Sequence, residues 1–126
     1  MTATPDDRRY LETHEWHRLD GDLVVVGVSA FAVDELSDVT YVEFLETSGR
    51  IEAGQTFGEI ESVKATSDLY CGISGEIVEV NVQVQEDPAI LNQDPFGQGW
   101  LIKVRPDDPQ QLQGLKSAAE YDADHA

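Results

Sequence analysis

The chain has 126 residues, 40% of them hydrophobic, which is enough for one domain with a single core. Eight basic and 25 acidic residues give a formal net charge of −17, which disfavours binding to nucleic acid and anionic membranes. No apolar run approaches the ~20 residues of a membrane-spanning helix, and from the polar N-terminus, which has no apolar signal region, we expect no signal or transit peptide. We therefore expect a cytoplasmic protein whose acidity serves solubility, docking onto basic partner surfaces, or both.

Short strands separated by glycines dominate the pattern along the chain. β-branched residues predict a buried strand over residues 23–28, and alternation predicts strands over 39–45 and 77–84, with another over 100–104. Between them, residues 57–63 and 65–70 read as the two arms of a hairpin.

Two segments have helical character. Ser29 is a candidate N-cap for a short helix over 29–36, and residues 109–121 are compatible with a C-terminal helix. We expect residues 1–8 to be flexible and residues 122–126 to fray. Residues 38–44 also resemble residues 76–82. A duplicated strand unit would suggest two similar sheets packed face to face, but the match is too short to stand alone, and chance similarity between amphipathic strands is the alternative.

Lys64 stands where the hairpin would turn. The turn lacks the Asn-Gly or Gly-Gly pair that tight hairpins prefer. A lysine at such a tip projects its ammonium into solvent on a flexible stem, as a carrier of a mobile group requires. Lysine is scarce here, since only Lys103 and Lys116 follow. Spacing alone leaves an ordinary surface lysine as the alternative.

The segment around Lys64 resembles the lipoylation segment of glycine cleavage system H proteins. It reads Glu-Ser-Val-Lys-Ala-Thr-Ser-Asp over residues 61–68. Further blocks resemble the same family in the same order, and together they extend from about residue 10 to residue 121: the His-Glu-Trp block at 13–16, then 27–32, 38–44, 74–81 and 88–103. Several ordered blocks are more specific than any one of them.

The resemblance implies a mainly β fold in one domain over residues 1–126. This fold is a small sandwich of two antiparallel sheets of the lipoyl- and biotinyl-carrier type (a barrel-sandwich hybrid), with a short helix in the N-terminal half and a C-terminal helix. It also implies that Lys64 carries lipoic acid in amide linkage, attached by a lipoate ligase or octanoyl transferase. The chain would then be a carrier and not an enzyme.

The resemblance implies three enzyme partners for this carrier. The lipoyl group would take the aminomethyl group of glycine from the pyridoxal-phosphate-dependent glycine decarboxylase and deliver it to the aminomethyltransferase, which uses tetrahydrofolate. It would pass electrons to dihydrolipoyl dehydrogenase, a flavin (FAD) enzyme. The hard chemistry belongs to the cofactor, and the protein supplies position and docking.

Thr13, Glu15 and Asp68 match family positions associated with a cleft for the loaded arm. A carboxylate in such a cleft would shield an aminomethyl amine from decomposition in water. Without the resemblance, Glu15 and Asp68 would simply be two surface acids among 25.

Other reactive side chains suggest no catalytic or metal site. Cys71 lacks a nearby base and is expected to pack in the core, as are Trp16 and Trp100. His14 and His17 alone are a weak metal-binding pattern.

Three positions depart from the family pattern: Gly72 and Glu46 stand where proline is common, and Ser37 stands where glycine is common. These departures leave open an H-like paralogue that relays lipoyl groups to other proteins or serves sulfur oxidation. Biotin domains usually have methionines on both sides of the modified lysine, whereas Val63 and Ala65 flank Lys64 here. Lipoyl domains of 2-oxo acid dehydrogenases usually have an acidic residue just before the lysine and sit in a longer chain, so Val63 and the short chain disfavour that class. An acidic interaction domain without a cofactor is the alternative from another class.

Overall fold

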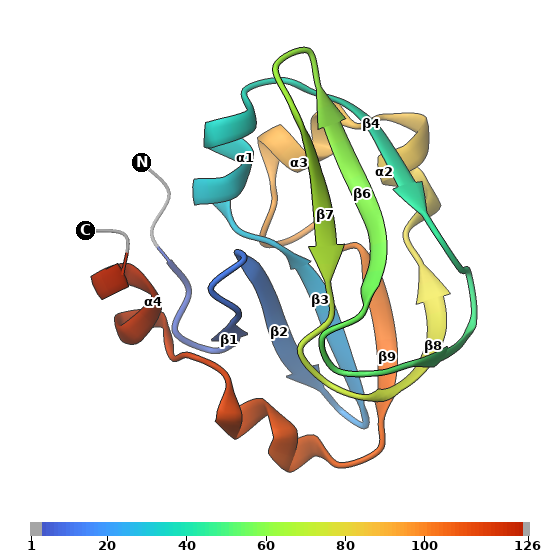
Figure 1. Cartoon of the computed structure of the whole chain (residues 1–126), viewed down its shortest axis with the longest axis vertical. Helices are drawn as coiled ribbons and strands as arrows, with labels where there is room; N and C mark the ends of the chain where they lie inside the picture. The colour runs from blue at the N-terminus through green and yellow to red at the C-terminus, as the bar shows by residue number, and fades with distance from the viewer. Residues whose placement is uncertain (1–3, 125–126) are drawn as a thin grey trace.

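Two antiparallel sheets form the framework of the computed structural model, which describes residues 4–124 (Figure 1). The six-stranded sheet has the order β1 (Arg9–Tyr10), β2 (Glu15–Asp20), β3 (Leu23–Val28), β9 (Ile102–Pro106), β8 (Gly75–Val80) and β5 (Gly49–Ile51). The three-stranded sheet has the order β4 (Val39–Phe44), β6 (Thr56–Ser62) and β7 (Thr66–Tyr70). The predicted pair of antiparallel sheets is confirmed, and within residues 4–124 neither sheet closes into a barrel.

Short helices connect and flank the sheets: α1 (Ala30–Leu36), α2 (Val82–Glu86), α3 (Ala89–Gln93), the 3-10 helix η1 (Pro109–Gly114) and α4 (Ala118–Asp124). The predicted N-cap of α1 is confirmed, since the Ser29 hydroxyl accepts a 3.4 Å hydrogen bond from the Ala32 N–H. The Tyr121 hydroxyl on α4 lies 2.7 Å from the Ser29 hydroxyl, which ties the C-terminal helix to α1. No helix within residues 4–124 is long and apolar enough to cross a membrane.

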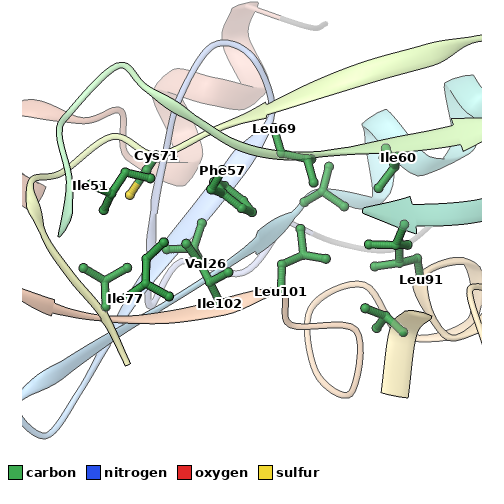
Figure 2. Packing of buried hydrophobic residues seen from close by; sticks show 14 of the residues in the cluster. Val26, Ile51, Phe57, Ile60, Leu69, Cys71, Ile77, Leu91, Leu101 and Ile102 are labelled. Atoms are coloured by element: carbon green, nitrogen blue, oxygen red, sulfur yellow. The ribbon is translucent and has the colours of Figure 1, made fainter. Parts of the chain in front are cut away.

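The main core lies between the two sheets (Figure 2). Phe57 and Leu69 of the smaller sheet pack in one cluster with Val26, Ile77 and Ile102 of the larger sheet, and each is at most 2% exposed. Fully burying one such side chain stabilises the fold by about 1.5–3 kcal/mol relative to leaving it exposed. This packing anchors β6 and β7, the strands that carry the turn at Lys64.

A second cluster surrounds Trp16 on β2. Its indole is fully buried, and Nε1 donates a 3.0 Å hydrogen bond to the Pro95 carbonyl. Gly27 lies opposite Trp16 in the β2–β3 register, and a Cβ there would collide with the indole. The prediction of a core aromatic is therefore confirmed for Trp16, whereas Trp100 is only half-buried, with the Lys103 ammonium 4.7 Å from its ring centre.

The strand predicted over residues 77–84 is wrong in its second half. The chain turns into α2 after Asn81, whose side chain accepts a 3.2 Å hydrogen bond from the Gln83 N–H. The Asn81 amide group also donates to the carbonyls of Gln98 and Trp100, at 2.9 and 2.7 Å. These side-chain bonds outweigh the alternating valines, which pointed to a continuous strand.

The continuous helix predicted over residues 109–121 is wrong in its middle. Between η1 and α4 the backbone is extended at Lys116, which exchanges hydrogen bonds of 2.8 and 2.9 Å with Tyr10. The strand predicted over 100–104 begins only at Ile102. In β4, a bulge between Val39 and Tyr41 breaks the predicted alternation, so Tyr41 is 46% exposed.

The chain termini were predicted to be flexible, and residues 1–3 and 125–126 lie outside the described part. Within it, the Tyr10 hydroxyl donates a 2.6 Å hydrogen bond to the Pro5 carbonyl, and the Thr4 hydroxyl donates one of 2.6 Å to Asp122. α4 continues to Asp124, into the segment expected to fray.

The two copies of the weak repeat fall mainly on β4 and β8, one in each sheet.

Candidate functional site

Lys64 lies on the turn that joins β6 to β7, at the upper end of the smaller sheet in Figure 1. The expected hairpin with Lys64 at its tip is therefore present. Val63 beside it is 94% exposed. The exposed Lys64 side chain extends to the end of α1, where Nζ donates a 3.0 Å hydrogen bond to the Glu35 carbonyl. Unpaired carbonyls at a helix C-terminus carry partial negative charge, which suits an ammonium group.

Ser62, the last residue of β6, holds the turn together, and sequence reasoning missed this role. Its N–H donates a 2.8 Å hydrogen bond to the Ala65 carbonyl. Its hydroxyl accepts hydrogen bonds from the N–H groups of Lys64 and Ala65, at 3.2 and 3.1 Å. A serine that opens a turn commonly bonds backbone groups two or three residues later, so the signal was available in the sequence.

Glu15 lies on β2 with its carboxylate fully buried. The Thr13 hydroxyl donates a 2.5 Å hydrogen bond to Oε1, and the Tyr70 N–H donates one of 2.6 Å to Oε2. Burial raises the pKa of Glu15 to about 7, against the opposing effect of these two donors. The structure thus brings Thr13 and Glu15 together and fastens them to the end of β7.

Asp68 is exposed on β7, two residues before Tyr70, so both side chains leave the same side of the strand. Within residues 4–124, no hydrogen bond or ion pair is described between Asp68 and Glu15 or Thr13. Asp68 pairs in register with Glu59, which pairs with Glu43 on β4. The pKa of Glu59 is raised, first by desolvation and then by the carboxylates of Glu61, Glu43 and Asp68. Asp68 therefore belongs to a strongly acidic sheet face.

Comparison with known proteins places this arrangement in a family. The family model for the Glycine cleavage H-protein matches residues 8–125. The chain belongs to the glycine cleavage H-protein family. A glycine cleavage system H protein of Prochlorococcus marinus is 52% identical over 117 residues, which cover 93% of this chain and 89% of that protein. A probable H protein of Haloarcula marismortui is 47% identical, with 93% and 92% covered.

A solved structure from the same family has the same fold. The crystal structure of a glycine cleavage system H protein from Mycobacterium marinum superposes with a TM-score of 0.87 at 39% identity. The match covers 96% of this chain and 98% of that one. The resemblance of the ordered sequence blocks to the H-protein family is thereby confirmed.

Gly72, where the family pattern often has proline, has a specific partner in this family member. Its N–H donates a 2.9 Å hydrogen bond to Nε2 of His17, which is fully buried. Burial lowers the pKa of His17 to about 3, so the ring is neutral at physiological pH. His17 and Glu15, two residues apart on β2, thus hold the N–H groups of Gly72 and Tyr70, also two residues apart.

The remaining candidate side chains have structural surroundings. Cys71 is fully buried, and its thiol donates a 3.3 Å hydrogen bond to the Ile73 carbonyl. Burial raises the pKa of this thiol to about 11, and the predicted packing role is confirmed. Within residues 4–124, no group of three or more His, Cys, Asp or Glu side chains could hold a metal ion.

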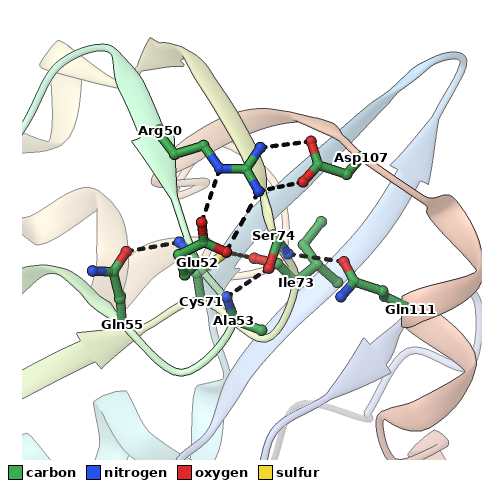
Figure 3. Close-up of polar contacts among 9 residues, drawn as sticks. All are labelled: Arg50, Glu52, Ala53, Gln55, Cys71, Ile73, Ser74, Asp107 and Gln111. Atoms are coloured by element: carbon green, nitrogen blue, oxygen red, sulfur yellow. Dashed lines mark hydrogen bonds and ion pairs between the residues drawn. The ribbon is translucent and has the colours of Figure 1, made fainter.

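A polar network lies at the opposite end of the molecule from the Lys64 turn (Figures 1 and 3). Arg50 forms ion pairs with Glu52 and with Asp107, which follows β9. Ser74 extends the network, since its hydroxyl accepts a 2.9 Å hydrogen bond from the Ala53 N–H. These side chains bind one another through hydrogen bonds and ion pairs and connect three loops, so we assign them a structural role in the H-protein fold.

Proposed function

We propose that this chain is the lipoyl carrier of a glycine cleavage system and that Lys64 holds the lipoyl group in amide linkage. The observation that carries the proposal is the position of Lys64 on an exposed turn in a member of the H-protein family. The other two lysines are engaged elsewhere. Lys103 pairs with Glu79 at 3.6 Å, and Lys116 pairs with Asp124 at 2.6 Å.

The residues around Lys64 fit a covalently attached arm. The amine is exposed, and its Glu35 contact is a single hydrogen bond to a backbone carbonyl. Acylation removes the positive charge of the amine and leaves one N–H, so the attraction to the end of α1 weakens. The lipoyl group supplies the disulfide that accepts the aminomethyl group and two electrons, whereas the protein supplies an exposed amine on an anchored turn.

The carrier serves three enzymes in this proposal. It takes the aminomethyl group from the pyridoxal-phosphate-dependent decarboxylase, delivers it to the tetrahydrofolate-dependent aminomethyltransferase and returns electrons to the FAD-containing dihydrolipoyl dehydrogenase. A lipoate ligase or octanoyl transferase attaches the arm. The formal net charge of −17 supports rapid encounter with basic patches on such partners.

Thr13, Glu15 and Asp68 form the resting site of the loaded arm in this proposal. Asp68 offers an exposed carboxylate to a cationic amine. Glu15 lies deeper, with both carboxylate oxygens already accepting hydrogen bonds, and its pKa of about 7 leaves it partly protonated near neutrality. A cation close to Glu15 favours its ionised form, so loading the arm lowers the pKa of Glu15.

Glycine–bicarbonate exchange in the presence of glycine decarboxylase tests the carrier role. The lipoylated protein supports exchange, and Lys64→Arg folds normally but supports none. Lys116→Arg is the matched control and retains full exchange. Exchange by Lys64→Arg at the parent rate would rule out Lys64 as the attachment site. A lipoylated parent without exchange would instead favour a lipoyl relay to other proteins.

A further inference from the structure

We propose that Ser62 is the positioning residue for acylation of Lys64: its hydroxyl fixes the turn in the form that the acylating enzyme receives. The inference rests on the proposed lipoyl attachment at Lys64. It starts from the way in which this turn departs from an ordinary two-residue hairpin. Such hairpins usually need central residues with positive φ, which Asn and Gly supply.

The turn residues Val63 and Lys64 do not have this backbone conformation. Within residues 4–124, the only non-glycine residues with positive φ are His14 and Ser37. One of the two backbone hydrogen bonds that close a tight turn is present, from the Ser62 N–H to the Ala65 carbonyl at 2.8 Å. The reciprocal Ala65 N–H instead donates to the Ser62 hydroxyl at 3.1 Å.

The hydroxyl therefore replaces a backbone group in closing the turn. It also accepts the Lys64 N–H at 3.2 Å and donates to the Ala65 carbonyl at 3.3 Å. A hydroxyl has one proton to donate and two lone pairs to accept, so the turn uses its full capacity. One bond goes directly to the backbone of the residue to be modified. Residue 62 thus sets the direction in which the Lys64 side chain leaves the sheet.

Acylation makes demands that such a turn meets. The deprotonated Lys64 amine attacks the acyl carbon of an acyl adenylate; the new N–C amide bond forms as the C–O bond to AMP breaks, and the amine proton passes to solvent. Attack requires the amine to approach in a defined geometry, and each degree of freedom left in the turn lowers the fraction of productive encounters.

The isosteric pair Ser62→Thr and Ser62→Val tests the inference, because both are β-branched and only threonine keeps a hydroxyl. We measure kcat/KM for acylation by a lipoate ligase with ATP and lipoate, following the mass of the intact protein. Ser62→Val loses about tenfold, the equivalent of one to two net hydrogen bonds. Ser62→Thr stays within about twofold of the parent, as does the control Ser67→Ala, which replaces an exposed serine of β7.

Amide hydrogen exchange provides a second readout, which does not require the acylated protein. In Ser62→Val the amides of Lys64 and Ala65 exchange faster, while those in β8 and β9 do not change. Equal rates of acylation for the valine and threonine variants, with unchanged amide protection, would overturn the proposed role of Ser62 and leave the proposed lipoyl attachment at Lys64 standing. Failure of the parent itself to be acylated on Lys64 would overturn the proposed function and this inference with it.

Discussion

The imidazole Nε2 of His17 accepts a 2.9 Å hydrogen bond from the backbone N–H of Gly72. This bond gives a physical reason for one departure from the family pattern. Gly72 stands where proline is common, and proline has no N–H to donate. With His17 fully buried, a proline at this position would leave Nε2 without a donor. The bond thus accounts for the absence of proline at residue 72, since any other residue keeps the N–H that His17 accepts.

Gly72→Pro should lower the free energy of unfolding by about 1–3 kcal/mol, because a buried acceptor loses its partner. Urea unfolding monitored by fluorescence measures the change. Gly72→Ala is the control, since it keeps the N–H and adds a Cβ 3.0 Å from Leu115 and 3.1 Å from Leu11, at the flexible ends of these side chains. The proline should cost less in a His17→Val background. An equal loss in both backgrounds would show that His17 and Gly72 are not coupled.

Glu15→Gln should change how stability depends on pH. The folded pKa of about 7 exceeds the ordinary value of 4.5 for a glutamate in the unfolded chain, so the native state binds more protons than the unfolded state between these values. The contribution of this carboxyl to the free energy of unfolding is therefore smallest at high pH. It falls by up to about 3 kcal/mol as the pH rises from 4.5 through 7. Glutamine can still accept the Tyr70 N–H and donate to the Thr13 hydroxyl.

The measurement is urea unfolding of both proteins at several values from pH 4.5 to pH 8. The stability of Glu15→Gln relative to the parent should rise across this window and level off above pH 7. A constant difference between the two proteins would mean that Glu15 titrates at its ordinary pKa in the folded state.

Cys71 should be unreactive towards thiol reagents in the native protein. The thiolate is the reactive form, and both full burial and a pKa of about 11 disfavour it at pH 8. Reaction with a chromogenic disulfide should be at least ~100-fold slower in the native protein than in urea. Equal rates with and without urea would show that the segment after β7 opens readily.

Hydrophobic patterns predicted the sheets but not all of their boundaries. Residues 23–28 and the α1 cap at Ser29 follow from local propensity, and both are present. The alternating valines of 77–84 failed as a guide, because Asn81 bonds to carbonyls that lie 17 and 19 residues away. A window of neighbouring residues carries no information about such partners.

The difference between local contacts and contacts distant in sequence also decides which parts of the site could be predicted. The turn bonds of Ser62 lie within three residues, so its role could have been read from the sequence. The bond from Gly72 to His17 spans 55 residues, and so does that from Tyr70 to Glu15. The family motif pointed to Glu15 and Thr13, but only the fold shows that they already hold each other and the end of β7.

The most direct test of the account is to map the site of lipoyl attachment. The parent protein and Lys64→Arg are incubated with a lipoate ligase, ATP and lipoate, then digested and analysed by mass spectrometry. The parent should gain one lipoyl increment on Lys64, with Lys103 and Lys116 unmodified, and Lys64→Arg should gain none. Lys64→Arg should also unfold within about 0.5 kcal/mol of the parent, because its side chain is exposed. An increment on Lys103 or Lys116, or none on the folded parent, would contradict the account.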